Sequence, residues 1–109
     1  MSLDEYVNKD HNNRKRYIFK HLVASIISEY GNLNGNIQLD LTKEDFKYIM
    51  PLVRDGYVIK YDTTETKQYK LNGTKYNFKT TTWGLTDIGR EIAIKNMNRE
   101  GVVVWVMSV

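Results

Sequence analysis

The sequence predicts an α+β fold, in which helices form a base and a small antiparallel sheet is attached to it. Apolar residues recur at helical spacing in three stretches, which are residues 14–30, 43–55 and 85–98. Between the second and third stretches, residues 57–83 are rich in Tyr, Val, Ile, Thr and Phe, which fit a pleated, half-buried strand. The chain has 109 residues and a single proline, which suits one compact domain.

The first helix is expected to follow a polar N-terminal tail. Residues 1–13 carry few apolar anchors, so we expect a tail, with a short helix over residues 4–10 that contacts a partner chain as the alternative. From residue 14 the pattern is helical, and Gly31 is placed to end the helix. We assign the domain itself to residues 14–98. The main apolar face of the first helix comprises Tyr17, Ile18, Leu22, Ile26 and Tyr30.

The second helix has its own start and stop signals. Thr42 can cap its N-terminus, and Asp45 stands three residues on, where an acid helps to satisfy the first-turn donors. An Asp-Gly pair follows its last turn. Pro51 lies inside this helix and removes a backbone hydrogen bond, so we expect a kink near residues 47–50 or two short helical pieces. The apolar stripe of the helix comprises Phe46, Ile49, Met50 and Val53.

The β-rich run contains a strong turn signal. Asn72-Gly73, between YKL and TKYNF, is typical of a tight hairpin turn. Because residues 63–66 break the run, we predict three strands, at residues 57–63, 67–71 and 74–83. The alternative is one long hairpin with residues 65–74 as its tip. Upstream, residues 37–41 alternate between apolar and polar types, which predicts a further short strand.

The last helix is followed by an unusually apolar segment. Thr86 is placed to cap the helix, and Ile88, Ile92 and Ala93 are expected to form its buried stripe. Residues 102–109, VVVWVMSV, are strand formers without charge, and such a run is an aggregation hazard when exposed. We therefore predict that residues 99–109 form an apolar strand or a dimerisation segment. The chain is expected to be a homodimer joined by this segment and the N-terminal helix.

Several classes of protein are excluded or disfavoured by composition. The chain has no cysteine, so it contains neither disulfides nor cysteine-based zinc sites, which fits a reducing cytoplasm. No stretch is long and apolar enough for a membrane span, and the polar N-terminus does not resemble a signal peptide. His11 and His21 stand without further ligands at metal spacing, and no catalytic motif is found. We expect a non-enzymatic cytoplasmic protein without cofactor.

Basic residues suggest where a polyanion could bind. The net charge is +3, and the β-rich run holds more lysines than acids, with tyrosines between them. Such lysines can neutralise phosphates, although lysines also protect exposed strand edges from pairing. The outward face of the second helix is expected to show Lys43, Lys47, Tyr48 and Arg54, whereas Glu44 and Asp45 would repel phosphates at its N-terminus. The lysines of the β-rich run are Lys60, Lys67, Lys70, Lys75 and Lys79.

Two motifs, DFKYIMPLVRDGYVIKYD and WGLTDIGREIAIKN, together resemble the helix–strand–wing–strand–helix core of small winged-helix proteins. The pattern is similar to that of MarR- and PadR-like regulators and of small winged-helix proteins from Gram-positive bacteria and their phages. The resemblance covers residues 14–98. It implies a recognition helix that bears Lys43, Lys47, Tyr48 and Arg54, and a wing that bears Lys67, Lys70 and Lys75.

The resemblance implies a transcription regulator that binds duplex DNA and is borne by a phage or plasmid. The chain departs from the family pattern, because too few residues separate its first two helices to hold another full helix. The motif identifies no small-molecule effector. The alternative function is a protein–protein interaction module built on the same fold.

Overall fold

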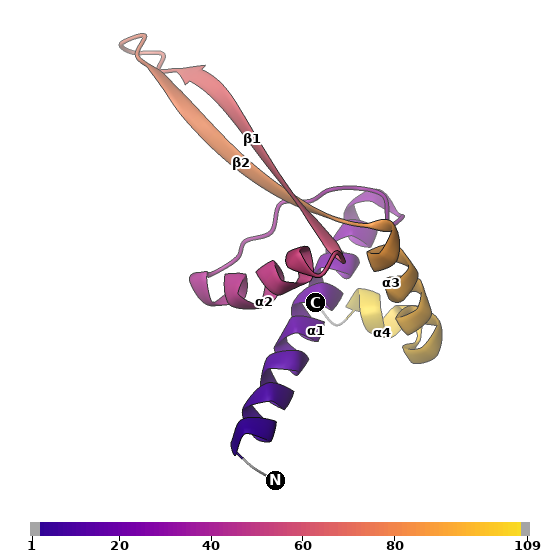
Figure 1. Ribbon diagram of the computed structural model, residues 1–109. Coiled ribbons are helices and arrows are strands. Elements are labelled where there is room, and N and C mark those ends of the chain that lie inside the picture. Colours follow the sequence, from indigo (N-terminus) through magenta and orange to yellow (C-terminus); the bar gives the residue numbers. More distant parts are fainter. Residues whose placement is uncertain (1–2, 108–109) are drawn as a thin grey trace.

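The computed structural model describes residues 3–107 and confirms the α+β class. Figure 1 shows a body of helices from which a single long hairpin rises. The two strands pair antiparallel and form the sheet of the described chain. The elements in order are α1 (Leu3–Tyr30), α2 (Lys43–Arg54), β1 (Val58–Gln68), β2 (Lys75–Leu85), α3 (Asp87–Glu100) and α4 (Val102–Met107).

Helix α1 begins earlier than expected. Residues 3–13, which we assigned to a polar tail, are helical, as the alternative of a helix over residues 4–10 expected. No glycine or proline occurs between residues 3 and 30, and the helix ends where Gly31 takes a φ of 72°. Figure 1 shows the N-terminal half of α1 extending beyond the rest of the body.

The core lies where α1, α2, α3, α4 and the base of the hairpin meet. Its two largest side chains, Trp83 of β2 and Trp105 of α4, are both fully buried. Burying an aromatic side chain of this size removes about 150–250 Å² from water, worth about 4–6 kcal/mol. The Trp83 ring contacts Phe46, and the Trp105 ring contacts Phe19 edge-on. The tryptophans therefore fix β2 and α4 to the helices.

Helix α2 is one continuous helix despite Pro51, so the two-piece alternative is wrong. The predicted capping box is present: the Thr42 amide donates to Asp45 Oδ2 at 2.9 Å, and the Asp45 amide donates to Thr42 Oγ1 at 3.2 Å. Ile49 is completely buried, whereas Phe46 retains partial exposure over Trp83. The apolar stripe is thus confirmed at its centre and only partly covered at its edge.

The sheet corrects the three-stranded prediction. One hairpin runs in unbroken register from Val58 opposite Leu85 to Gln68 opposite Lys75, and residues 69–74 form its tip. The threonines at positions 63, 64 and 66 continue the strand because β-branched side chains fit extended backbone. The predicted strand at residues 37–41 is reduced to a single bridge, in which Ile37 and Trp83 exchange backbone hydrogen bonds of 2.8 and 2.9 Å.

The C-terminal segment also differs from the prediction, because residues 102–107 form helix α4 and not a strand. A helix satisfies its own backbone hydrogen bonds, so this apolar run needs no sheet edge. Trp105 faces the core, while Val102, Val103 and Val104 remain exposed. In α3, Ala93 is buried and Ile92 packs against the core, but Ile88 is exposed, contrary to expectation. Residues 108 and 109 lie outside the described residues.

The two motifs noted in the sequence meet in space at the base of the hairpin. The Thr86 hydroxyl, which also caps α3, donates to the Gly56 carbonyl oxygen at 2.5 Å. The Thr86 amide donates to the Tyr57 carbonyl oxygen at 3.2 Å. Gly89 lies against the same carbonyl, and a Cβ there would fall 2.1 Å from the oxygen. The turn after α2 and the start of α3 are therefore locked together, which fixes where the hairpin emerges.

Candidate nucleic-acid interface

The hairpin is an arm that projects from the body. Each strand has 11 residues, and β1 is exposed at every position from Lys60 onward. The buried residues of the hairpin lie at its base, at Val58, Trp83, Gly84 and Leu85. The molecule measures 60 × 36 × 23 Å, and Figure 1 shows the hairpin extending far from the helices. Most of both strands is thus available to a partner.

The charged side chains at the end of the arm are all basic. The outer hairpin, which we define as residues 66–79, contains four lysines and no acid. The acids lie nearer the base, where Asp62 accepts a 2.6 Å hydrogen bond from Thr81 and pairs with Lys60 at 3.5 Å. The Thr81 hydroxyl and, secondarily, Lys60 hold the pKa of Asp62 below its ordinary value. The lysines of the outer hairpin are Lys67, Lys70, Lys75 and Lys79.

The lysines predicted for the wing do not share one face. Residues directly opposite in the register lie on the same side of a hairpin, and successive residues alternate sides. Lys67 is opposite Tyr76, and Lys75 is opposite Gln68, so Lys67 and Lys75 lie on opposite sides. Lys70 lies in the tip. The three lysines therefore surround the end of the arm instead of forming a flat patch.

One side of the arm carries a row of aromatic rings. The ammonium group of Lys67 lies 4.1 Å from the centre of the Phe78 ring, and the Tyr69 and Tyr76 rings stack at 4.5 Å. Tyr61 lies on this same side nearer the base, because it is an even number of residues from Lys67. Cross-strand pairs of this kind stabilise a two-stranded hairpin that has no core of its own.

Three of the four residues predicted on α2 lie on its outer surface. Lys43, Lys47 and Arg54 are exposed and project away from the side that holds buried Ile49. The Arg54 guanidinium makes an exposed ion pair with Asp55 at 3.3 Å. An ion pair this exposed is weak and leaves the arginine able to turn toward another anion.

Tyr48 does not lie on the outward face. Its ring is partly buried against the core, and the guanidinium of Arg14 from α1 lies 5.7 Å from its centre. The prediction that Tyr48 faces outward is wrong, because α1 packs on the flank of α2 where Tyr48 projects.

The two acids at the start of α2 have local partners. Asp45 is engaged in the capping box, and Glu44 pairs with Arg14 at 3.2 Å. Arg14 therefore offsets part of the negative charge that was expected to repel phosphates from this end of the helix.

The basic residues of α2 and those of the outer hairpin form two separate groups. Lys67 is nine residues beyond Val58, which corresponds to about 30 Å along a strand. α2 lies in the body, next to the base of the hairpin. This length of strand is close to one turn of B-DNA, about 34 Å. A single duplex that contacts both groups must therefore be at least about one turn long.

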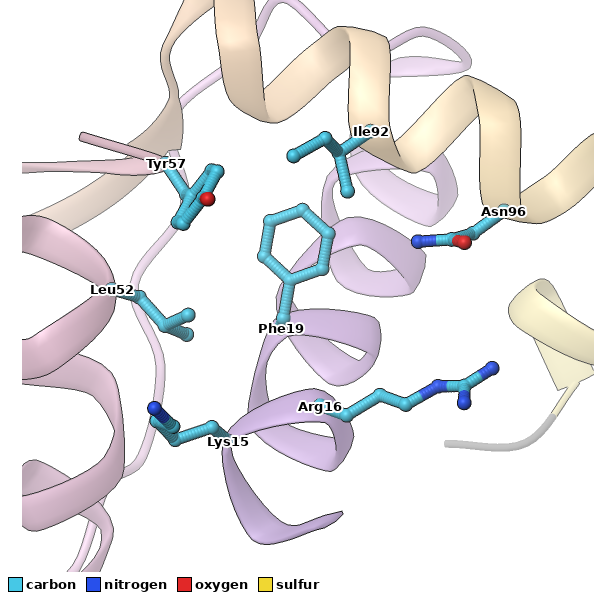
Figure 2. Close-up of a pocket in the computed structure, with 7 residues that line it drawn as sticks. All are labelled: Lys15, Arg16, Phe19, Leu52, Tyr57, Ile92 and Asn96. Atoms are coloured by element: carbon cyan, nitrogen blue, oxygen red, sulfur yellow. The ribbon is translucent and has the colours of Figure 1, made fainter. Parts of the chain in front are cut away.

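The body also contains a pocket of about 240 Å³ between α1, α2 and α3 (Figure 2). Its apolar wall comprises Phe19, Leu52 and Ile92. Arg16 lies at its rim but is ion-paired with Glu100. The seven lining residues include no carboxylate, histidine, serine or cysteine, and the titratable side chains among them are those of Lys15, Arg16 and Tyr57. The seven are Lys15, Arg16, Phe19, Leu52, Tyr57, Ile92 and Asn96.

Two further findings concern residues 3–107. Among the side chains that the structure describes, those of residues 13–106, no group of three or more His, Asp or Glu is arranged to hold a metal ion. None of its helices combines the length and apolarity that crossing a membrane requires. His21 is partly buried in α1, and its ring stacks with Tyr17 at 6.5 Å.

Comparison with known proteins leaves the family open, because no protein-family model, curated protein or solved structure matches this chain. The function is therefore argued from the arrangement of its own residues.

Proposed function

We propose that this chain is a non-enzymatic transcription regulator of the winged-helix type that binds duplex DNA. The observation that carries the proposal is the arm, whose outer hairpin presents four lysines and no acid well away from the body. The order α1–α2–β1–β2–α3 also fits the helix–strand–wing–strand–helix arrangement of that class. One departure remains, since residues 31–42 contain no helix between α1 and α2.

The arm suits a groove because its lysines project on both sides. Two-stranded ribbons enter either the major or the minor groove of B-DNA, and phosphates line both walls of either groove. Lys67 and Lys75, on opposite sides of the ribbon, would then reach phosphates of the two strands. Lys43, Lys47 and Arg54 on α2 would contact the backbone nearer the body. Binding of this kind depends on phosphate contacts first and on base contacts second.

The proposal is tested by measuring affinity for a duplex of about 20 base pairs as salt is varied. Each phosphate contact contributes about 0.9 to the slope of log K against log salt. The variant Lys70→Ala/Lys75→Ala should therefore bind more weakly and lower the slope by about 2. Lys67 is left in place because its contact with Phe78 also supports the hairpin.

The matched control is Lys15→Ala/Lys95→Ala, which removes the same charge from the helical body and should bind almost as the parent does. If both double variants lose affinity equally, net charge and not the arm is responsible. If the parent shows no salt-sensitive duplex binding, the DNA-binding proposal fails.

A homodimer is part of the proposal. α4 exposes three consecutive valines, Val102, Val103 and Val104, on a segment without charge. A second copy of the chain would cover them, because an uncharged apolar surface favours a like surface over water. A symmetric dimer would present two arms to a pseudo-palindromic site.

The aromatic side of the arm favours a second candidate, a protein–protein interaction module. Tyr61, Tyr69 and Phe78 remain exposed there, and aromatic residues are enriched in protein interfaces. This candidate predicts no salt-sensitive duplex binding, together with a partner protein that co-purifies with the parent and is lost from Tyr61→Ser/Phe78→Ser.

A further inference from the structure

The tip of the arm presents a fully exposed leucine. The exposed fraction of Leu71 is 101 %, the highest among the exposed large apolar side chains of the described chain. A single exposed leucine is common on protein surfaces. Leu71 is distinguished by its position, because it lies in the tip that joins β1 to β2, with Lys70 directly before it.

The tip that carries Leu71 is well ordered by hydrogen bonds. The Tyr69 amide donates to the Thr74 carbonyl oxygen at 3.0 Å, and the Gly73 amide donates to the Tyr69 carbonyl oxygen at 2.9 Å. The Thr74 amide donates to Asn72 Oδ1 at 2.9 Å. Beneath the tip, the stacked Tyr69 and Tyr76 rings brace the two strands. Leu71 is therefore held outward by a braced turn.

The surroundings of Leu71 match one kind of partner. All charged side chains of the outer hairpin are lysines, so its partner is expected to be anionic. Leu71 adds an apolar contact among these lysines. Duplex DNA offers this combination, since its phosphates flank a stack of apolar base faces. A hollow of about 330 Å³ beside Leu71, lined also by Tyr69, Lys70 and Asn72, leaves room for a sugar or base edge.

We infer that Leu71 is a wedge that enters between two base pairs from the minor groove and kinks the duplex. Leucine is one of the side chains that proteins use to unstack base steps in this way. The lysines around the tip would hold the flanking phosphates while the stack opens. This inference rests on the proposed function and deepens it, because it makes the partner a deformable or already distorted duplex.

The wedge predicts a preference among duplexes. Pyrimidine–purine steps such as TA and CA/TG open easily, and a mismatched pair is already partly unstacked. The parent should therefore bind a duplex with a central mismatch about tenfold more tightly than the matched duplex, because part of the unstacking cost is removed. It should also bend the matched duplex on binding.

The experiment uses the full chain, duplexes of about 20 base pairs with a fluorophore at each end, and variants Leu71→Ala and Ile88→Ala. Energy transfer reports the bend, and titration reports affinity and salt slope. Leu71→Ala should keep the parent's salt slope, lose the bend and bind matched and mismatched duplexes equally. Ile88→Ala, which shortens another exposed apolar side chain on α3, should behave as the parent does.

The possible outcomes separate the two proposals. If the parent binds duplex but bends it no more than Leu71→Ala does, the wedge is refuted and the proposed function stands. If the parent binds no duplex, both fail. Binding to vesicles of anionic lipid that depends on Leu71, without duplex binding, would assign the tip to a membrane surface and also overturn the wedge.

Discussion

At the residue scale, Gly89 shows why the LTDIG motif ends in glycine. The residue is buried in the first turn of α3, where the helix meets the turn that follows α2. A Cβ at this position would fall 2.1 Å from the backbone oxygen of Tyr57. Backbone cannot rotate away as a side chain end can, so the close approach requires glycine. The motif is therefore explained by packing at the base of the arm.

Gly89→Ala is expected to destabilise the fold. The added methyl group would push α3 away from Tyr57 and strain the two hydrogen bonds that Thr86 makes to the same turn. Overpacking of this kind costs about 1–3 kcal/mol of unfolding free energy. Urea unfolding followed by circular dichroism measures the loss. Asn98→Ala, an exposed substitution in the same helix, should change stability by less than about 0.5 kcal/mol. Equal stability of Gly89→Ala and the parent would contradict the packing argument.

Residue-level features were predictable where their causes lie within a few positions of the sequence. Thr42 with Asp45, and Thr86 alone, act as predicted caps because capping depends on the residue type and on spacing along the chain. The direction of Tyr48 was not predictable in this way. It depends on α1, which is distant in sequence and covers one flank of α2. Helical spacing alone could not show that Tyr48 is partly buried while its neighbour Lys47 is exposed.

At the element scale, an element was predictable when local sequence alone determines it, and was not when it depends on contacts with another element. The hairpin turn at Asn72-Gly73 is local and was predicted, but the sequence left open whether three strands or one long hairpin would form, and the structure has the hairpin. Threonines tolerate both loop and strand, so residues 63–66 are decided by the cross-strand register. Likewise, VVVWVM has strand-forming composition yet forms α4, because Trp105 packs into the core against Phe19 in the middle of α1. Tertiary contacts override composition in both cases.

The exposed valines of α4 allow a test of the proposed dimer. Val103 is the most exposed of its three consecutive valines, at 66 %, so lysine can replace it without disturbing the core. If a second copy covers this face, Val103→Lys places a charge in the apolar contact and should shift the chain from dimer to monomer. Sedimentation equilibrium measures the shift, and circular dichroism checks the fold. Ile88→Lys, at an exposed site on α3 (54 %), serves as the control. A dimer that survives Val103→Lys would assign dimerisation to another surface.

At the scale of the whole molecule, the arm makes the chain elongated. The radius of gyration is 17.0 Å, compared with about 13 Å for a compact domain of this length. This shape was not predictable, because three short strands and one long hairpin share nearly the same sequence pattern. Its consequence is that the positive charge of α2 and that of the outer hairpin lie far apart. A partner that contacts both groups must be long, whereas a short partner can contact only one group at a time.

This separation predicts how affinity depends on duplex length. A duplex of about 10 base pairs spans about 34 Å and leaves no margin for contacts at both ends, whereas one of about 20 base pairs can contact α2 and the arm together. The variant Lys43→Ala/Lys47→Ala should therefore weaken binding to the longer duplex several-fold and have little effect on the shorter one, where the arm alone is engaged. Fluorescence anisotropy at fixed salt measures both affinities, and Lys15→Ala/Lys95→Ala controls for the loss of charge. If the α2 variant weakens binding to both duplexes to the same degree, α2 and the arm contact the same short stretch of DNA. The prediction that the two groups bind sites about one turn apart would then be wrong.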